Sequence, residues 1–145
     1  MELRIKKLNP LAVIPSYGSA SAAGADLYAC EGGEVTIKSG ETKLIHTGIA
    51  MEIPDGYVGL VYARSGIAVK RGLAPANKVG VIDSDYRGEI MVALHNHSDI
   101  EQTIADAERI AQIVIAPYLT VDFTLAEELD ETERGAGGFG STGTK

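Results

Sequence analysis

The apolar runs of this chain are short, and this restricts its fold more than any other feature. Apolar and polar residues alternate over a few positions, as in residues 42–47 and 57–62, and are then interrupted by turns such as Pro54-Asp55-Gly56. Turn signals about every 8–12 residues are typical of β-sandwiches and barrels. An all-β fold is therefore predicted, with strands at residues 3–6, 25–29, 35–38, 42–47, 51–53, 57–62, 103–104, 113–116 and 121–125.

One segment interrupts this pattern, because residues 65–72 read as a short helix. Ser65 is the expected N-cap, and Gly72 is the expected stop residue just past the last turn. Arg64 precedes the helix start. Free backbone N–H groups at a helix start, a hydroxyl and a guanidinium together also suit a phosphate. The capping role and the phosphate-binding role are compatible.

Residues 78–96 contain the most unusual chemistry. Two apolar runs, 79–82 and 90–94, flank a polar loop, which predicts a β-hairpin. Within the second run, Ile90, Val92 and Leu94 should share one face of a strand.

The loop of this predicted hairpin contains two carboxylates. Asp83 and Asp85 are common turn formers whose side chains bond nearby backbone N–H groups, and that structural role explains them when the loop is taken alone. Asp83, however, directly follows Val81 and Ile82, so its carboxylate lies where the strand leaves the core. A catalytic role for Asp83 is the alternative.

Gln112 is the one amide inside an otherwise apolar run. A buried glutamine needs hydrogen-bond partners for its amide. The partner is either a structural group of the fold or a ligand, and the residue type alone does not decide between them.

The C-terminal residues cannot form a core of their own. Five of the ten residues at 134–143 are glycine, and they follow an acidic run. A β domain over residues 1–125 and a flexible arm over residues 126–145 are expected. The arm also carries Arg134, Phe139 and hydroxyl residues among its glycines, and Gly-rich backbone wraps phosphates well.

Composition limits the partners of the chain. The formal net charge is −7, which argues against non-specific binding to nucleic acid or to anionic membranes. Cys30 is the only cysteine, so no intramolecular disulfide can form, as suits a reducing compartment. The first residues lack the apolar core of a signal peptide, and no run approaches the roughly 20 apolar residues of a membrane span. A cytoplasmic protein is expected.

Five segments of the chain resemble, in order and spacing, the five motifs of the trimeric dUTP diphosphatases (dUTPases). The segments lie at residues 23–29, 63–72, 77–91, 109–115 and 134–143, and they include the sequences AGADLYA, ARSGIAVKRG, GVIDSDYRGEI, RIAQIVI and RGAGGFGSTG. The resemblance implies a jelly-roll fold, a homotrimer and hydrolysis of dUTP to dUMP and pyrophosphate with Mg²⁺. That reaction keeps uracil out of DNA and supplies dUMP for thymidylate synthesis. In this family each active site draws on three subunits, and the C-terminal arm of one closes over the others.

The resemblance assigns roles to particular residues. Asp83 is implied as the general base that activates a water for in-line attack on the α-phosphorus, and Asp26 as the Mg²⁺ residue, acting through water. Tyr86 is implied to pack under the deoxyribose and Phe139 to stack on the uracil. The implied contacts to the phosphates are Arg64, Ser65, Gly66, Gln112, Arg134, Gly140, Ser141 and Thr142. The implied contacts to the uracil edge are Asn77, Val81, Ile82 and Met91.

Two other functions are compatible with the sequence. A dCTP deaminase, or a bifunctional dCTP deaminase/dUTPase of the same fold, would need a catalytic glutamate near the loop, where Glu89 is the nearby candidate. A regulatory module that signals through its dUTP-bound state is the second. His95 and His97 have no further metal ligand near them in sequence, and the chain lacks the Gly-x-Ser-x-Gly elbow of a serine hydrolase. The resemblance assigns no role to His46, His95 or His97.

Overall fold

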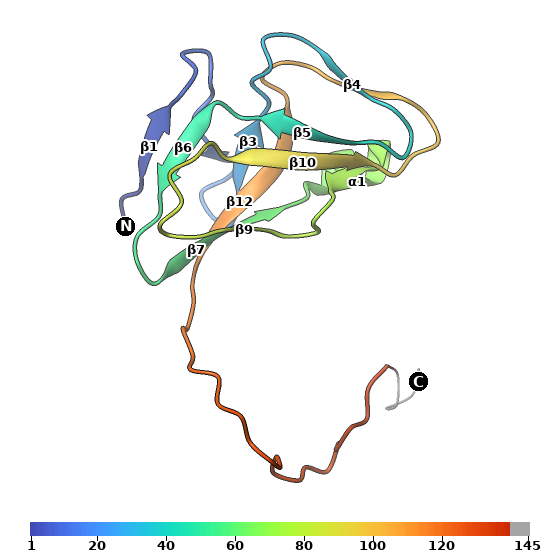
Figure 1. Ribbon diagram of the computed structural model, residues 1–145. Coiled ribbons are helices and arrows are strands. Elements are labelled where there is room, and N and C mark those ends of the chain that lie inside the picture. The colour runs from blue at the N-terminus through green and yellow to red at the C-terminus, as the bar shows by residue number, and fades with distance from the viewer. Residues whose placement is uncertain (140–145) are drawn as a thin grey trace.

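The computed structural model describes residues 1–139 (Figure 1). The predicted phosphate contacts Gly140, Ser141 and Thr142 lie outside these residues. Within residues 1–139, no helix is long and apolar enough to cross a membrane.

Short strands make up most of the described chain, and α1 is its one helix. The elements in chain order are β1 (Arg4–Lys7), β2 (Ser16–Tyr17), β3 (Ala25–Tyr28), β4 (Val35–Ile37), β5 (Thr42–His46), β6 (Ile49–Glu52), β7 (Tyr57–Tyr62), α1 (Ser65–Arg71), β8 (Leu73–Pro75), β9 (Gly80–Ile82), β10 (Met91–Asn96), β11 (Gln102–Ile104) and β12 (Arg109–Pro117).

The strands form a jelly-roll of small antiparallel sheets that enclose one core (Figure 1). The largest sheet has the order β2-β3-β12-β7-β9, and a second has the order β5-β10-β8. Two further pairs, β1-β6 and β4-β11, complete the body. Most neighbours in these sheets are far apart in sequence, so the fold depends on long-range strand pairing.

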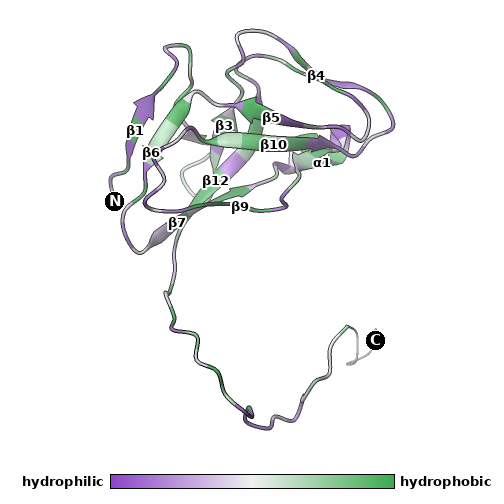
Figure 2. Ribbon diagram, viewed as in Figure 1, coloured by the Kyte–Doolittle hydropathy of each residue, from purple (hydrophilic) through white to green (hydrophobic). Residues whose placement is uncertain are grey.

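The core confirms the predicted alternation. Ile90, Val92 and Leu94 are at most 1% exposed, whereas Met91 and Ala93 between them are only half-buried. Figure 2 shows β6, β9 and β10 mainly in the hydrophobic colours and β1 in the hydrophilic colour. Full burial of one such aliphatic side chain stabilises the fold by about 1.5–3 kcal/mol.

The predicted hairpin at residues 78–96 is wrong in its pairing. Both strands exist, but β9 pairs with β7 in the large sheet, whereas β10 pairs with β5 and β8 in the other. The backbone N–H of Ile90 donates to the carbonyl of Ile49 at 2.9 Å, so the chain leaves the loop beside β6 rather than beside β9. The loop therefore bridges two sheets.

The ends of α1 confirm one prediction and correct another. Gly72 has φ +66°, in the left-handed region, and its N–H closes the last turn, as predicted. Ser65 is the first helical residue and not the N-cap, because Arg64 holds that position with an extended backbone and no side-chain capping bond. The Ser65 hydroxyl is therefore not needed to cap the helix.

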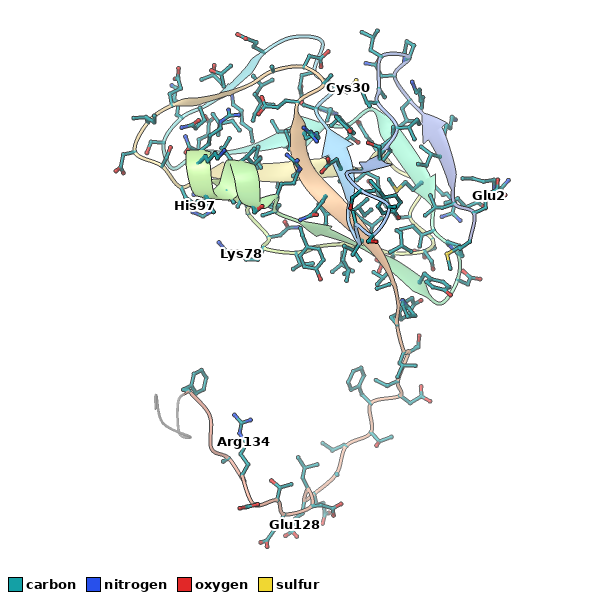
Figure 3. All side chains as sticks on the ribbon, turned by 180° about the vertical axis from the view of Figure 1, so that it is seen from behind. Glu2, Cys30, Lys78, His97, Glu128 and Arg134 are labelled. Carbon is teal, nitrogen blue, oxygen red and sulfur yellow. The ribbon has the colours of Figure 1, made fainter. Side chains whose placement is uncertain are left out.

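The segment after β12 leaves the body (Figures 1 and 3). The predicted strand at residues 121–125 is wrong: no strand forms there, and Phe123 and Leu125 are almost fully exposed. Figure 3 shows the side chains of Glu128 and Arg134 far from the β body. A segment with alternating apolar residues forms a stable strand only when a neighbouring strand shares its backbone hydrogen bonds. Within the described chain, residues 121–125 have no such neighbour.

Candidate active site

A pocket of about 210 Å³ lies against the loop between β9 and β10, and we call it the loop pocket. It is lined by Leu44, Val81, Ile82, Asp83, Tyr86, Glu89 and Met91. The structure thus brings together five predicted residues, the general base and four of the uridine contacts. Leu44 and Glu89 were not predicted as substrate contacts. Leu44 comes from β5, whose pairing with β10 is not visible in local sequence.

Hydrogen bonds within the loop fix its shape. The Tyr86 N–H donates to the Asp83 carbonyl at 3.2 Å, and the Tyr86 hydroxyl donates to the Glu89 carbonyl at 3.0 Å. A Cβ atom on Gly88 would lie 2.4 Å from the Tyr86 Oη atom. Glycine is therefore required at residue 88 for the Tyr86 ring to occupy this place.

Asn77 does not line the loop pocket. Its side chain is exposed, and its Nδ2 atom lies 3.3 Å from the position that a Cβ of Gly80 would take, at the start of β9. The absence of a side chain at Gly80 leaves room for this amide. Asn77 is thus adjacent to the strand that enters the pocket, and its contact with a uracil stays a prediction.

The Glu89 carboxylate is held by hydrogen bonds from His46 and Gly48. Its Oε2 accepts from His46 Nδ1 at 2.9 Å, and its Oε1 accepts from the Gly48 N–H at 2.8 Å. Burial alone would raise the pKa of Glu89, but the hydrogen bonds from His46, Gly48 and Thr47 lower it overall. The hydrogen bond to Glu89 in turn raises the pKa of His46. The two side chains form an ion pair when His46 is protonated.

A second pocket, of about 220 Å³, is lined by two arginines, Arg64 and Arg109, and we call it the arginine pocket. It is lined by Gly18, Ala22, Gly24, Asp26, Arg64, Ser65, Gly66, Arg109 and Gln112. All five predicted residues from the first, second and fourth motifs meet here. Arg109 was not predicted as a contact, although its place in the fourth motif, three residues before Gln112, was a signal for it.

Asp26 is the centre of charge in the arginine pocket. It is 8% exposed, and its two oxygens accept from Arg64 Nε at 2.6 Å and from Arg109 Nη1 at 3.3 Å. Two guanidinium groups face one carboxylate, so the pocket keeps an excess of positive charge. Such a pocket suits an anion such as a phosphate.

Gln112 connects β12 to the residue before Arg64. Its Nε2 donates to the Ala63 carbonyl at 2.9 Å, so one partner of the amide is a structural group of the fold. A Cβ atom on Gly24 would lie 2.4 Å from Gln112 Oε1, so Gly24 leaves the space that the amide occupies. Gln112 therefore has a structural hydrogen bond and also lines the pocket.

The loop pocket and the arginine pocket of one chain share no residue. In the register between β7 and β9, Gly59, near the start of β7, pairs with Ile82, the residue before Asp83. Arg64 follows the other end of β7. Asp83 and Arg64 therefore lie toward opposite ends of β7, in separate pockets.

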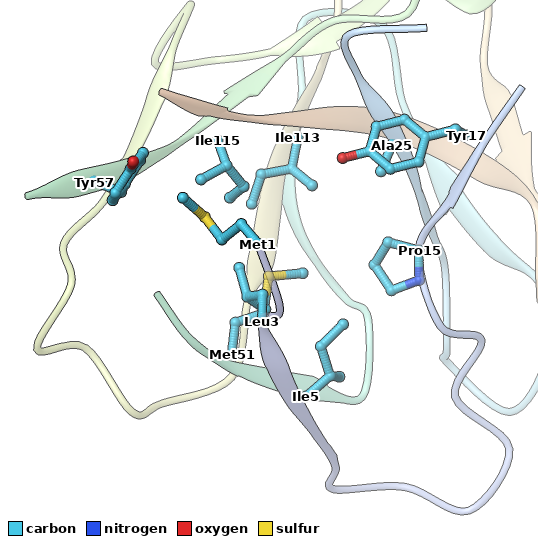
Figure 4. A pocket seen from close by; sticks show the side chains of 10 residues that line it. All are labelled: Met1, Leu3, Ile5, Pro15, Tyr17, Ala25, Met51, Tyr57, Ile113 and Ile115. Carbon is cyan, nitrogen blue, oxygen red and sulfur yellow. The ribbon is translucent and has the colours of Figure 1, made fainter. Parts of the chain in front are cut away.

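A larger pocket of about 400 Å³ lies near the N-terminus (Figure 4). Its walls are apolar and include Met1, Leu3, Met51 and Ile115, with two tyrosines at its edges. It contains none of the predicted site residues and no charged side chain. It is unsuited to a triphosphate.

The predicted arm residues that the structure describes are not brought to either pocket. Arg134 Nε donates to the carbonyl of Gly137 at 2.8 Å, and Phe139 is fully exposed. Arg134 lies well away from the body in Figure 3.

The arginine pocket fits a Mg²⁺ ion that is held mainly by a ligand and by water. Within residues 1–139, no group of three His, Cys, Asp or Glu side chains is arranged to hold a metal, and Asp26 is the one carboxylate that lines the pocket. Mg²⁺ in phosphate-handling sites keeps several waters and uses one or two carboxylates together with phosphate oxygens. Because both Asp26 oxygens already accept hydrogen bonds, a contact through water suits this carboxylate better than a direct one.

Comparison with known proteins agrees with this geometry. A family model described as dUTPase matches residues 11–143. A deoxyuridine 5'-triphosphate nucleotidohydrolase from Nautilia profundicola is 55% identical over 143 residues, 99% of each chain. The protein of the same name from Hydrogenobaculum sp. is 49% identical over 145 residues, 100% of each chain. A solved structure of the Staphylococcus bacteriophage 80alpha dUTPase with dUPNHPP superposes with a TM-score of 0.90, at 31% identity over 98% of each chain. On this evidence the chain belongs to the dUTPase family.

Proposed function

We propose that this protein hydrolyses dUTP to dUMP and pyrophosphate, with Asp83 as general base and with Mg²⁺. The observation that carries the proposal is the loop pocket, which gathers Asp83, Tyr86 and the two ends of the flanking strands around one small cavity. The arginine pocket supplies the complementary cationic surface for a triphosphate.

Asp83 lies at the edge of the loop pocket with an exposed side chain, where a water can reach it. In the proposed step Asp83 takes a proton from that water, the water oxygen bonds to the α-phosphorus, and the bond from that phosphorus to the bridging oxygen breaks. Pyrophosphate leaves and carries the electron pair of the broken bond. A positioned base of this kind contributes about 10²–10⁴-fold to the rate.

Uracil is recognised at the backbone in this proposal. The groups of Val81, Ile82 and Met91 face the pocket from the two strand ends, and the Asn77 amide is adjacent. Uracil presents acceptor, donor and acceptor groups in turn, whereas cytosine places a donor where uracil has its O4 acceptor. An unpaired group in the pocket would cost about 1–3 kcal/mol. Tyr86 then packs under the deoxyribose and leaves no room for a 2′-hydroxyl.

The phosphates bind in the arginine pocket, to Arg64, Ser65, Gly66 and Gln112, and Arg109 adds a further cation. Asp26 would hold Mg²⁺ through water, and the cation would supply charge neutralisation on the triphosphate and on the departing pyrophosphate. When the phosphates arrive, the Arg64 guanidinium is already oriented by Asp26.

The active protein is proposed to be a homotrimer with shared sites. Its support is that Asp83 and Arg64 lie in separate pockets toward opposite ends of β7, so that one active site combines the loop pocket of one copy with the arginine pocket of another. The exposed residues Phe123 and Leu125 also lack a packing partner within the described chain. In the trimer the arm of a further copy, from residue 126 onward, brings Arg134 and Phe139 to the substrate, together with Gly140, Ser141 and Thr142.

The cellular role proposed for the protein is to keep uracil out of DNA and to supply dUMP, in the cytoplasm. Its partners are then dUTP and its own copies. The net charge of −7 supports the absence of a nucleic-acid or membrane partner in this proposal.

Product analysis tests the function directly. The purified protein with Mg²⁺ is incubated separately with dUTP, UTP and dCTP, and dUMP, pyrophosphate and ammonia are measured. Pyrophosphate from dUTP alone is expected. Ammonia from dCTP would instead support the deaminase, for which Glu89 is the candidate residue, although its carboxylate is already bound to His46 and Gly48. Light scattering of the same sample measures the mass and separates a trimer from a monomer.

A further inference from the structure

Glu89 makes two sets of contacts that meet at Tyr86. Its carboxylate accepts hydrogen bonds from His46 Nδ1, at the end of β5, at 2.9 Å and from the Gly48 N–H, in the connection to β6, at 2.8 Å. Its own carbonyl accepts the Tyr86 hydroxyl at 3.0 Å. The same residue therefore fastens the loop to a neighbouring strand connection and holds the aromatic ring of the loop pocket.

We propose that Glu89 is a positioning residue that sets the place of the Tyr86 ring, and thereby the preference for deoxyribose over ribose, through its ion pair with His46. This inference rests on the proposed function, because Tyr86 acts on the sugar only if a nucleotide occupies the loop pocket. Glu89 acts through Tyr86 and does not itself need to touch the sugar.

The Glu89 side chain is one of several contacts that hold the end of the loop against residues 46–49. The loop bridges two sheets, and on its C-terminal side Thr47 Oγ1 donates to the Ile90 carbonyl, so the backbone after Glu89 is already fixed. The Tyr86 ring lies directly over Gly88, which has no side chain to block it. The Glu89 side chain adds a side-chain link between the loop and residues 46–48, beside the bonds that Ile90 makes to Thr47 and Ile49.

The ion pair makes this link sensitive to pH. Two carboxylates lie near His46: Glu89 from the loop accepts from the ring Nδ1, and Glu31 Oε1 accepts from the backbone N–H of His46 at 2.6 Å. The hydrogen bond to Glu89 raises the pKa of His46, and the pKa of Glu89 is lowered. The charged pair is present between these two pKa values and is lost as the pH rises through the pKa of His46. Cys30, whose N–H donates to the His46 carbonyl, also borders this cluster, and burial raises the pKa of its thiol.

The test compares sugar discrimination in the full-length protein with Mg²⁺. We define discrimination as kcat/KM for dUTP divided by kcat/KM for UTP, measured from about pH 6 to about pH 9 around the ordinary histidine pKa. Glu89→Gln keeps the shape of the side chain but removes its charge, and His46→Asn removes the other partner. Tyr86→Ala gives the value expected when the ring is absent. Glu52→Gln is the matched control, because Glu52 also forms an ion pair, with Arg4 at 2.5 Å, but lies outside both pockets.

We expect discrimination to fall by at most about fivefold in Glu89→Gln and His46→Asn near pH 6, because the half-exposed His46 side chain leaves the ion pair open to solvent screening. The fall should come mainly from a lower KM for UTP, because a displaced Tyr86 ring leaves room for the 2′-hydroxyl. In the wild type, discrimination should decline as the pH rises, whereas in Glu89→Gln it should be flat. The control should follow the wild type.

Unchanged discrimination in a folded Glu89→Gln variant would overturn the proposal. So would a lower kcat with the same discrimination, which indicates a purely structural role. If Glu89→Gln does not fold, the result for His46→Asn decides the question in the same way. A wild-type protein that releases no pyrophosphate from dUTP would refute the proposed function instead, so the two failures are distinct.

Discussion

The loop pocket and the arginine pocket are built in opposite ways. Most of the loop pocket comes from one continuous stretch, residues 81–91, and hydrogen bonds inside that stretch hold its shape. The arginine pocket takes its walls from three distant stretches, residues 18–26, 64–66 and 109–112. A pocket of the first kind can be recognised in the sequence, whereas the second exists only after β3, β7 and β12 have paired.

The two pockets also differ in charge and in the way that the charge is held. Asp83 is exposed at the edge of the loop pocket, whereas Asp26 is buried and accepts hydrogen bonds from two arginines. We infer that the loop pocket carries the chemical step and that the arginine pocket carries phosphate binding. Substitutions in the two pockets should therefore affect different kinetic constants.

Asp83→Asn should have the largest effect on the loop pocket. The variant keeps the size of the side chain but cannot take the proton, so kcat for dUTP is expected to fall by about 10²–10⁴-fold. Calorimetric titration with a non-hydrolysable dUTP analogue should give a Kd close to the wild-type value. Asp55→Asn, in the turn before β7, is the matched control and should retain full activity. A kcat within a few-fold of wild type in Asp83→Asn would show that Asp83 is not the base.

Deletion of residues 134–145 tests the C-terminal arm, whose residues line neither the loop pocket nor the arginine pocket. These residues lie beyond the last strand, and those that are described are largely exposed, so the Tm and the oligomer mass should not change. We expect kcat/KM for dUTP to fall on the order of 100-fold, because the arm no longer completes the site. Replacing the same residues with an equally long Gly/Ser sequence should give the same loss. Aggregation of the truncated protein would show instead that the arm is structural.

Gly24→Ala tests the arginine pocket without removing a charge. The new Cβ would lie 2.4 Å from Gln112 Oε1, so the amide must move away from its place near Ala63. The expected result is a KM for dUTP about tenfold higher with a smaller change in kcat, the reverse of Asp83→Asn. Gly33→Ala, where a Cβ would meet nothing within 4 Å, is the control. A fall in kcat alone would contradict the division of roles between the pockets.

The smallest expected effect concerns stability and pH. The hydrogen bond to Glu89 raises the pKa of His46 in the folded protein. The stabilisation from protonated His46 is therefore complete below the pKa that His46 has in the unfolded chain, and it is lost as the pH rises through the pKa of His46 in the folded protein. Because the His46 side chain is 49% exposed, solvent screening limits the pair to less than about 1 kcal/mol. His46→Asn should therefore lower the unfolding free energy slightly near pH 6 and not at all near about pH 9. Urea titrations at both pH values measure this difference. An equal loss at both would show that the charge of His46 is not involved.

The sequence by itself determined the local features of this protein. Alternation identified most of the strands, Gly72 marked the end of α1, and the order of five motifs named the family and most of the pocket residues. These features are readable because strand alternation and helix termination depend on neighbouring residues.

Only the tertiary structure decided which strands pair and which charges meet. It placed β9 and β10 in different sheets, left residues 121–125 without a strand partner, and brought Arg64 and Arg109 to the same carboxylate of Asp26. Alternation states which face of a strand is buried but not which strand accepts its hydrogen bonds, because that choice depends on long-range packing. The same reason explains why the sequence indicated the site residues but not their separation into two pockets of one chain.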